Sequence, residues 1–293
     1  MSKWINQEYA KNQDNNDIKL IKVFKGDFDH TVPPPADPGK VCSGLVLDTE
    51  TTGLNHQKDT VIEIALRPFK FNTETFQVVS VGDPYSGLQD PGHALSKTTV
   101  SLTGLTDEIL KGQAIDWKAV SSRVAEASLI IAHNAQFDRP FVDKLTESSS
   151  GKLWGCSMSQ INWMAKGFKT TKLSLLTHYH GFTFDGHRAL SDVDATLHLM
   201  SMTDPETGKP YLAEIAEGIK RNRVRAFAWK SSFDKKDLLK NAGYKWNDQN
   251  KVWLRDLFRE DKDSELAWLT AKIYPAHSCF AEFTEIRRCD TFK

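Results

Sequence analysis

The stretch GLVLDTETTGL, residues 44–54, decides the fold of this chain. Its first four residues are a short apolar run of the kind that forms a buried strand. Asp48 and Glu50 follow at once and share a face, because side chains two apart in a strand point to the same side. Neighbouring buried carboxylates repel each other unless a cation lies between them, and oxygen ligands suit Mg²⁺ or Mn²⁺. The stretch predicts a metal site at the end of a strand, although an acidic pair there is also common as a solvated edge.

Length and composition are those of an ordinary globular protein. The 293 residues suffice for one large domain and a small one, and 40% of them are hydrophobic. The 38 basic and 38 acidic residues balance, so the composition gives no global attraction to nucleic acid. The four cysteines form no CxxC pair, which we interpret as free thiols in a reducing cytoplasm. No apolar run approaches a membrane span or a signal core, and we expect neither secretion nor membrane insertion.

Three regions follow one another along the chain. Residues 1–40 form a polar leader that we expect to pack loosely, and its proline-rich stretch 30–39 predicts an extended connection without helix. Residues 41–215 predict an α/β domain in which strands come first and helices follow around a mixed sheet. Residues 221–293 predict a small α+β domain, which holds four of the eight tryptophans. The strands expected after the first one are residues 61–66, 76–81 and 129–132.

A second informative stretch is IIAHNAQFDRPF, residues 130–141. A strand ends at Ala132, and Asp138 follows on a short helix that can aim it back at the edge of the sheet. Phe137 and Phe141 are spaced to anchor that helix in the core. The alternative is an exposed helical aspartate that pairs with Arg139.

A third stretch is GHRALSDVDATLHLM, residues 186–200, in which apolar residues recur at helical spacing. His187 lies in the loop before this helix, and Asp192 lies in its first turns, so both can face one cleft. Asp194 is about 200° further round the helix and should point away. We therefore expect Asp194→Ala to have little effect.

Together the three stretches resemble the DnaQ-like 3′-to-5′ exonucleases of the DEDDh subclass, a family that includes the proofreading subunit of bacterial DNA polymerase III. DTETTGL, HNAQFD and HRALSDVDAT match its three motifs, the flanking IEIA and LTGLTDE also match, and the resemblance covers residues 41–202. It implies a ribonuclease H-like mixed sheet flanked by helices. The family's five functional positions fall on Asp48, Glu50, Asp138, His187 and Asp192.

The resemblance also implies a mechanism. Four carboxylates would hold two divalent ions, Mg²⁺ or Mn²⁺, about 3.5–4 Å apart. Asp48 would bridge both ions, and His187 would take a proton from the attacking water. A 3′-terminal nucleotide would leave as a 5′-monophosphate. The residues expected to hold that nucleotide are Thr51, Leu54, Asn134 and Phe137.

Two further features leave alternatives open. Glu63 interrupts an apolar strand, where it could lie near the metal site or face solvent, and we expect the second. In the C-terminal domain, residues 235–241 predict a helix with Leu238 and Leu239 inward and Gly243 as its cap. The aromatic and lysine residues of this domain could bind single-stranded DNA or simply form its core.

We predict a free-standing exonuclease that degrades DNA from a single-stranded or frayed 3′ end. Degradation of RNA by the same fold is an alternative, because the motifs describe metal geometry and not the sugar. A non-catalytic module that binds 3′ ends, and a proofreading subunit that works with a polymerase, are two others.

Overall fold

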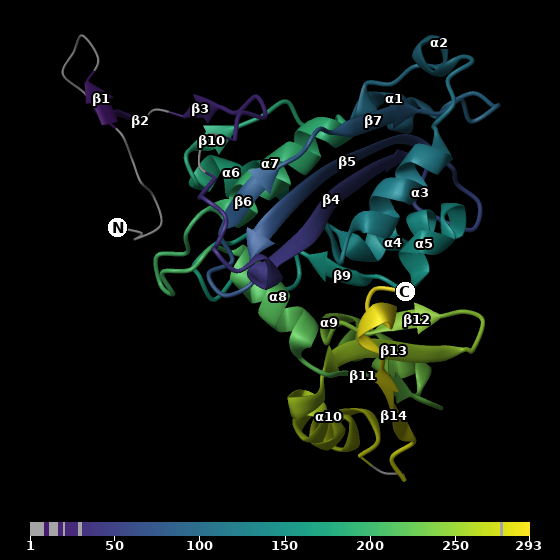
Figure 1. Cartoon of the computed structure of the whole chain (residues 1–293). Coiled ribbons are helices and arrows are strands. Elements are labelled where there is room, and N and C mark those ends of the chain that lie inside the picture. The colour runs from purple at the N-terminus through teal and green to yellow at the C-terminus, as the bar shows by residue number, and fades with distance from the viewer. Residues whose placement is uncertain (1–8, 12–16, 20, 29–30, 276–277) are drawn as a thin grey trace. The chain divides into compact units, whose positions relative to one another are not determined.

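The computed structural model describes residues 9–11, 17–19, 21–28, 31–275 and 278–293 (Figure 1). The chain forms two compact units, Met1–Gly218 with Phe292–Lys293, and Ile219–Thr291. Each unit has its own sheet and its own hydrophobic core. Within the described residues, no helix is long and apolar enough to cross a membrane.

The first unit is built on a six-stranded mixed sheet with the order β6-β5-β4-β8-β9, in which β7 also pairs with β5. The strand β5 runs antiparallel to β4, β6 and β7, whereas β8 is parallel to β4 and β9 is parallel to β8. The predicted mixed sheet is thus confirmed. The strands are β4 (Val41–Thr51), β5 (Val61–Asn72), β6 (Val78–Val81), β7 (Tyr85–Leu88), β8 (Leu129–Ala132) and β9 (Leu153–Cys156).

The strand β4 is longer than the sequence indicated. The apolar run begins at Gly44, whereas the strand already begins at Val41. As the prediction for Asp48 and Glu50 required, its pairing with β5 continues through both residues and slips by a bulge between Glu50 and Thr51. The two carboxylates therefore lie within the strand, because the backbone around them still finds hydrogen-bond partners on β5.

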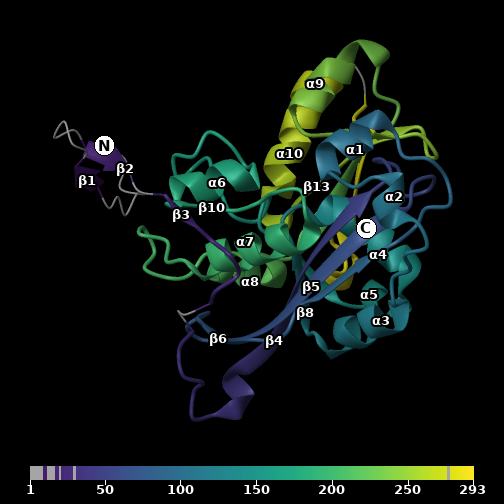
Figure 2. The ribbon, with the colours of Figure 1, turned by 90° about the horizontal axis from the view of Figure 1, so that it is seen from above.

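Helices cover both faces of this sheet, as expected for the fold (Figure 2). Leu45 and Leu47 of β4 pack with residues of α3 and α4 in one core cluster, whereas α7 packs against β4 and β5 from the other side. The helices are α1 (Lys97–Thr103), α2 (Asp107–Leu110), α3 (Trp117–Glu126), α4 (Ala135–Leu145), α5 (Glu147–Ser150), α6 (Leu173–Tyr179), α7 (Ala189–Ser201) and α8 (Leu212–Lys220).

Part of the N-terminal segment makes specific contacts with the first unit. The strand β3 (Lys22–Val23) pairs with β10 (Phe182–Thr183), and the ring of Phe24 stacks on His198 of α7 with centroids 4.4 Å apart. An aromatic side chain in an otherwise polar leader gains free energy by leaving water, which is the physical reason for this contact. Pro38–Lys40 forms a turn of 3₁₀ helix where only extended chain was predicted. His30 lies outside the described residues, and the strands β1 (Tyr9–Lys11) and β2 (Asp17–Lys19) pair with each other.

The second unit is a four-stranded antiparallel sheet of order β12-β13-β11-β14 with helices α9 and α10, and the predicted α+β class is confirmed. Gly243 has φ +87° just after α9, as its predicted capping role requires. Leu239 is fully buried, but Leu238 is 44% exposed, because it lies about 100° further round the helix, away from the side that faces the core of this unit. The elements are β11 (Arg223–Ala228), α9 (Lys236–Asn241), β12 (Lys245–Asn247), β13 (Val252–Phe258), α10 (Lys262–Trp268) and β14 (Ala281–Ile286).

Candidate active site

Three of the predicted carboxylates meet at one end of the sheet. Asp48 and Glu50 point from β4 toward the side covered by α7, and Asp192 comes from the first turn of that helix. One oxygen atom from each of the three lies within 4.8 Å of the other two. Segments more than 140 residues apart in the sequence thus form one acidic cluster, Asp48, Glu50 and Asp192.

Asp138 lies beside this cluster and is held by β4. Its carboxylate is only 2% exposed, and Oδ1 accepts hydrogen bonds from the Thr49 hydroxyl at 2.8 Å and the Thr49 N–H at 3.0 Å. Thr49 points away from its neighbours Asp48 and Glu50, toward the face where α4 packs. The alternative interpretation, in which Asp138 is exposed and pairs with Arg139, is therefore excluded. Arg139 instead forms an ion pair with Asp143.

His187 and Asp192 are joined through the backbone. The His187 N–H donates a hydrogen bond of 2.9 Å to Asp192 Oδ2, and His187 itself is exposed with φ +69°. A positive φ is uncommon for a residue with a side chain, so the surrounding contacts must hold this loop in place. The loop and the first turn of α7 form one connected unit at the edge of the acidic cluster.

The carboxylates repel one another and are poorly hydrated. Burial, reinforced by the charges of Asp138 and Asp192, raises the pKa of Asp48 well above its usual range. Burial and then the charge of Asp192 raise the pKa of Glu50 to about 7. Burial raises the pKa of Asp192 to about 6, although the hydrogen bond from His187 opposes this change. Burial likewise raises the pKa of Asp138 to about 7, against the two hydrogen bonds from Thr49.

Such a cluster is chemically suited to divalent cations. Carboxylate oxygens are the ligands that Mg²⁺ and Mn²⁺ prefer, and a bound cation removes the repulsion that raises these pKa values. The donor set of the described residues therefore fits the metal ions that the sequence resemblance implies.

The residues predicted to hold a terminal nucleotide lie next to the cluster in sequence but differ in exposure. Thr51 is 8% exposed, and its hydroxyl donates to the carbonyl of Gly53. Leu54 is 87% exposed, which is unusual for a large apolar side chain. Asn134 occupies the N-cap position of α4, and Phe137 is half-buried against Phe141 with ring centroids 5.2 Å apart.

The expectation that Glu63 faces solvent is wrong. Glu63 is 1% exposed, lies opposite Glu50 on β5, and forms an ion pair of 3.0 Å with Arg188. The sequence held a signal for this position, because β5 continues as an apolar run on both sides of Glu63 and so must be covered on both faces. Arg188, next to His187, was not singled out from the sequence.

The expectation for Asp194 is half correct. It points away from the acidic cluster, as its place on the helix predicted, but it is 7% exposed and forms a two-pronged ion pair with Arg67 at 2.6 and 2.7 Å. Breaking a buried ion pair leaves an uncompensated charge. Asp194→Ala should therefore lower the free energy of unfolding and is not a silent control.

Other polar features of this unit have structural explanations. His133 of the second motif is half-buried, and desolvation lowers its pKa to about 4. Its Nε2 must donate to the carbonyl of Thr171 at 2.8 Å, so its Nδ1 accepts from the Ser157 hydroxyl. Trp154 and Trp163 are buried core residues.

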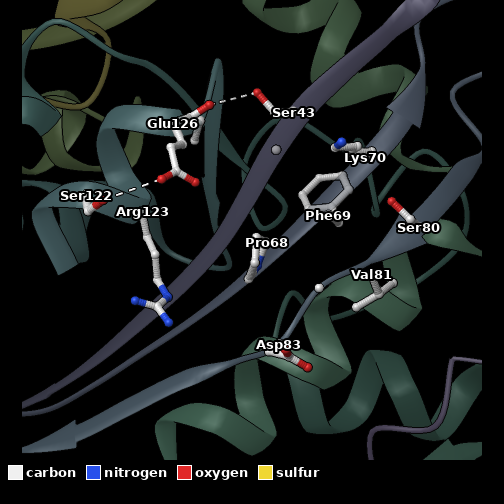
Figure 3. Close-up of a pocket in the computed structure, with 13 residues that line it drawn as sticks. Ser43, Pro68, Phe69, Lys70, Ser80, Val81, Asp83, Ser122, Arg123 and Glu126 are labelled. Atoms are coloured by element: carbon white, nitrogen blue, oxygen red, sulfur yellow. Dashed lines mark hydrogen bonds between the residues drawn. The ribbon is translucent and has the colours of Figure 1, made fainter. Parts of the chain in front are cut away.

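A separate cavity of about 460 Å³ opens near the start of β4, at the end opposite to the acidic cluster (Figure 3). Its walls include Phe69 and Lys70 of β5 and Arg123 of α3, and it contains none of the predicted site residues. Ser43 donates a hydrogen bond to the Glu126 carbonyl at its rim. This cavity is distinct from the acidic cluster.

Comparisons with known proteins agree with the site. The family model described as exonuclease matches residues 45–200, more than half of the chain. The chain therefore belongs to this exonuclease family, and the DnaQ-like assignment made from the three motifs is confirmed.

Curated relatives are PolC-type DNA polymerases III. The protein of Listeria welshimeri is 35% identical over 163 residues, 53% of this chain and 11% of the relative. That of Bacillus subtilis is 30% identical over 187 residues, 60% of this chain and 12% of the relative. The chain thus spans little more than a tenth of the length of these relatives.

Two solved structures are similar at low identity. E. coli exonuclease I in complex with a dA16 oligonucleotide has a TM-score of 0.49 and 15% identity, covering 85% of this chain and 64% of that chain. Exonuclease X in complex with 5′-overhanging duplex DNA has a TM-score of 0.40 and 21% identity, covering 52% of this chain and 86% of that chain.

Proposed function

We propose that the first unit is a 3′-to-5′ exodeoxyribonuclease that releases nucleoside 5′-monophosphates with two Mg²⁺ or Mn²⁺ ions. The observation that carries this proposal is the convergence of Asp48, Glu50 and Asp192 within 4.8 Å, with Asp138 beside them. When bound, the cations would lower the pKa of the attacking water and stabilise negative charge on the phosphate.

The residues of the chain have separable roles in this proposal. Asp48, Glu50, Asp138 and Asp192 hold the cations, and Thr49 orients Asp138 through its hydroxyl. His187 accepts the proton of the attacking water, and its loop is kept near Asp192 by the bond from its own N–H. Histidine suits this role because it gains and loses a proton near neutrality.

The terminal nucleotide would be held by the residues next to the cluster. Leu54 and Phe137 offer apolar surface to the base, because both are at least partly exposed beside acidic residues of the site. The backbone near Thr51 would contact the sugar, and Asn134 would support the site by hydrogen bonding. Their substitution by alanine should raise KM for DNA more than it lowers kcat.

DNA is the preferred substrate because the relatives are DNA polymerases by name. The same relatives support a second candidate, removal of mismatched 3′ ends beside a polymerase. RNA is the alternative substrate. A binding module without catalysis is less favoured, because such a module would have no need of the acidic cluster formed by Asp48, Glu50 and Asp192.

One experiment tests these readings together. The protein is incubated with 5′-labelled single-stranded DNA, duplex DNA with a matched or mismatched 3′ end, and RNA, in Mg²⁺, Mn²⁺ or chelator. A ladder that shortens DNA from the 3′ end and disappears with chelator is the expected result. Faster cleavage of mismatched ends would favour the proofreading role, a ladder on RNA alone would move the substrate to RNA, and intact substrates that still bind would favour the binding module.

We propose further that the second unit binds single-stranded DNA. Residues 219–291 contain 16 Lys and Arg and 11 Asp and Glu, whereas the rest of the chain contains 22 and 27. The positive charge is therefore concentrated in this unit, although the whole chain is neutral. Seven lysines of this unit form no ion pair within the described residues: Lys230, Lys235, Lys236, Lys240, Lys245, Lys262 and Lys272.

Aromatic rings lie among these lysines. Phe233 is 75% exposed with the ammonium of Lys236 at 4.1 Å from its ring centroid, and Trp246 on the edge strand β12 is 48% exposed. Exposed rings that stack on bases, together with lysines that contact phosphates, are the usual means of binding single strands. Trp253, in contrast, is 9% exposed and belongs to the core.

The test compares Phe233→Ala and Lys236→Ala with Lys272→Ala, an exposed lysine on another segment. The first two should raise KM for a long single-stranded oligonucleotide several-fold and make binding less dependent on salt. If Lys272→Ala has the same effect, the contribution is general charge and not this surface.

A further inference from the structure

Two ion pairs join β5 to α7 and its preceding loop, and β5 contributes the carboxylate to one pair and the guanidinium to the other. Glu63 of β5 accepts from Arg188 with Nη2–Oε1 at 3.0 Å, and Arg67 of β5 donates to Asp194 of α7 at 2.6 and 2.7 Å. Glu63 and Arg67 are four residues apart on one strand and so face the same side. The first pair lies next to the acidic cluster, and the second lies away from it.

Glu63 also closes the beginning of α7. The N–H of Ala189, the first residue of the helix, donates to Glu63 Oε2 at 3.3 Å. Such an N–H has no partner inside its own helix, and Arg188 in the N-cap position provides no side-chain bond. A carboxylate at the start of a helix is further favoured by the helix dipole. The buried side chain of Glu63, which belongs to β5, therefore supplies the N-terminal cap that Arg188 does not provide.

The loop before α7 is thus held at three successive residues. The His187 N–H is bound by Asp192, while the Arg188 guanidinium and the Ala189 N–H are both bound by Glu63. We propose that Glu63 and Arg188 are positioning residues that fix His187 and Asp192 for the reaction and set the affinity of the acidic cluster for cations. This inference rests on the proposed nuclease function of the same site.

The charges of the pair predict opposite effects on cation binding. Glu63 lies directly opposite Glu50 in the β4–β5 register, and its negative charge contributes to the raised pKa values of Asp48 and Glu50, whereas Arg188 lowers that of Glu50. Glu63→Gln leaves the guanidinium of Arg188 beside the cluster without its counter-charge and should weaken cation binding. Arg188→Gln leaves the buried negative charge of Glu63 without its partner and should strengthen cation binding.

Both substitutions should nevertheless slow catalysis, because each loosens the loop that carries His187. We expect kcat at saturating Mg²⁺ to fall about 10- to 100-fold in each variant, the range produced by small misplacements of catalytic groups. KM for DNA should change less than about threefold, since neither residue is assigned to the nucleotide pocket. The two variants should therefore lose kcat to a similar extent, but their affinities for cations should change in opposite directions.

The experiment uses the full chain, with Mn²⁺ as the probe. Mn²⁺ binding to the metal-free protein is measured by calorimetry, and kcat and KM are measured on a single-stranded oligonucleotide. Glu63→Gln should raise the Kd for Mn²⁺ about three- to tenfold, and Arg188→Gln should lower it. Arg188→Lys should return the Kd to the wild-type value but restore only part of kcat, because lysine keeps the charge without the planar fork.

Arg67→Gln is the matched control, because it breaks the other ion pair between β5 and α7. It should lower Tm while leaving kcat and the Kd for Mn²⁺ within about twofold of wild type. If it reduces kcat as much as Glu63→Gln does, the first pair acts only by general stabilisation and the inference is wrong. Equal Kd values in Glu63→Gln and Arg188→Gln would also overturn it.

Failure of the nuclease proposal would look different. A wild-type protein that cleaves no substrate in any metal would remove the proposed function, while the order of Mn²⁺ affinities would still test the effect of the two charges. A wild-type protein that cleaves DNA, with Glu63 and Arg188 variants that match it in kcat and Kd, would remove this inference alone.

Discussion

Replacing Asp192 by asparagine should stabilise the metal-free protein while abolishing its activity. Asp192 is a half-buried carboxylate in an acidic cluster, and asparagine has almost the same shape without the charge. The amide oxygen can still accept the hydrogen bond that the His187 N–H donates at 2.9 Å. The substitution therefore removes repulsion and leaves the loop before α7 anchored.

The expected size of the stabilisation follows from the pKa of Asp192. Burial raises this pKa from 3.8 to about 6, and the difference corresponds to about 3 kcal/mol for the charged form. The charge-assisted bond from His187 becomes a weaker neutral one, which costs about 1 kcal/mol. A net gain of about 2 kcal/mol at pH 8 remains and should raise Tm by about 4–8 °C for a unit of this size.

Scanning calorimetry at pH 8 measures the effect. Mg²⁺ should shift the transition of the first unit upward in the wild type, which identifies that transition, and should shift it little in Asp192→Asn. Activity on single-stranded DNA should fall at least about 1,000-fold, as expected when a group that acts on transition-state charge is lost.

Asp194→Asn, two positions further along α7, is the control. It disrupts the ion pair with Arg67 and should lower Tm, while the upward shift with Mg²⁺ and most of the activity are retained. If metal-free Asp192→Asn unfolds at a lower temperature than the wild type, repulsion within the cluster is not a source of instability and the reasoning is refuted.

Three other outcomes follow from the site and the sheet. The pKa of Glu50 is raised to about 7, so the folded metal-free protein keeps a proton that the unfolded chain has released. The free energy of unfolding of the metal-free protein should therefore fall as pH rises from 5 to 8, and the stabilisation by Mg²⁺ should grow over the same range. Calorimetry with chelator or Mg²⁺ checks both expectations, and a stability that does not change with pH would contradict them. Thr49→Val removes the 2.8 Å bond to Asp138 and should lower kcat about tenfold, whereas Thr49→Ser should keep most of it in steady-state assays. Gly44→Ala would place a Cβ 2.3 Å from the ring of Phe69 and should cost about 1–3 kcal/mol in urea unfolding, part of which Phe69→Leu should restore.

Much of the fold could be predicted from local pattern. The apolar runs at β5 and β8 and the helical spacing of α7 were recognisable because each element must present apolar side chains at its own period. The start of β4 was missed, since residues 41–43 precede the apolar run that indicated the strand. Only the pairing with β5 shows that the strand already begins at Val41.

The site was predictable to the extent that its residues belong to motifs. Asp48, Glu50 and Asp192 were named from sequence, and the structure brings their oxygens together. The buried position of Glu63 and the ion pair of Asp194 were not foreseen, because periodicity tells which face of an element a residue occupies but not what packs against that face. Whether the charge of Glu63 or Asp194 is solvated or paired depends on a partner on another element. In both cases that partner is more than 120 residues away in the sequence.

The sequence alone determined the exonuclease family, the mixed sheet and the residue types of the acidic cluster, because these depend on local periodicity and on short motifs. The tertiary structure decided how Thr49 holds Asp138, how Glu63 reaches Arg188 and the start of α7, and which leucine of α9 is buried. These contacts depend on distances between elements, which packing sets and which no single stretch of sequence contains.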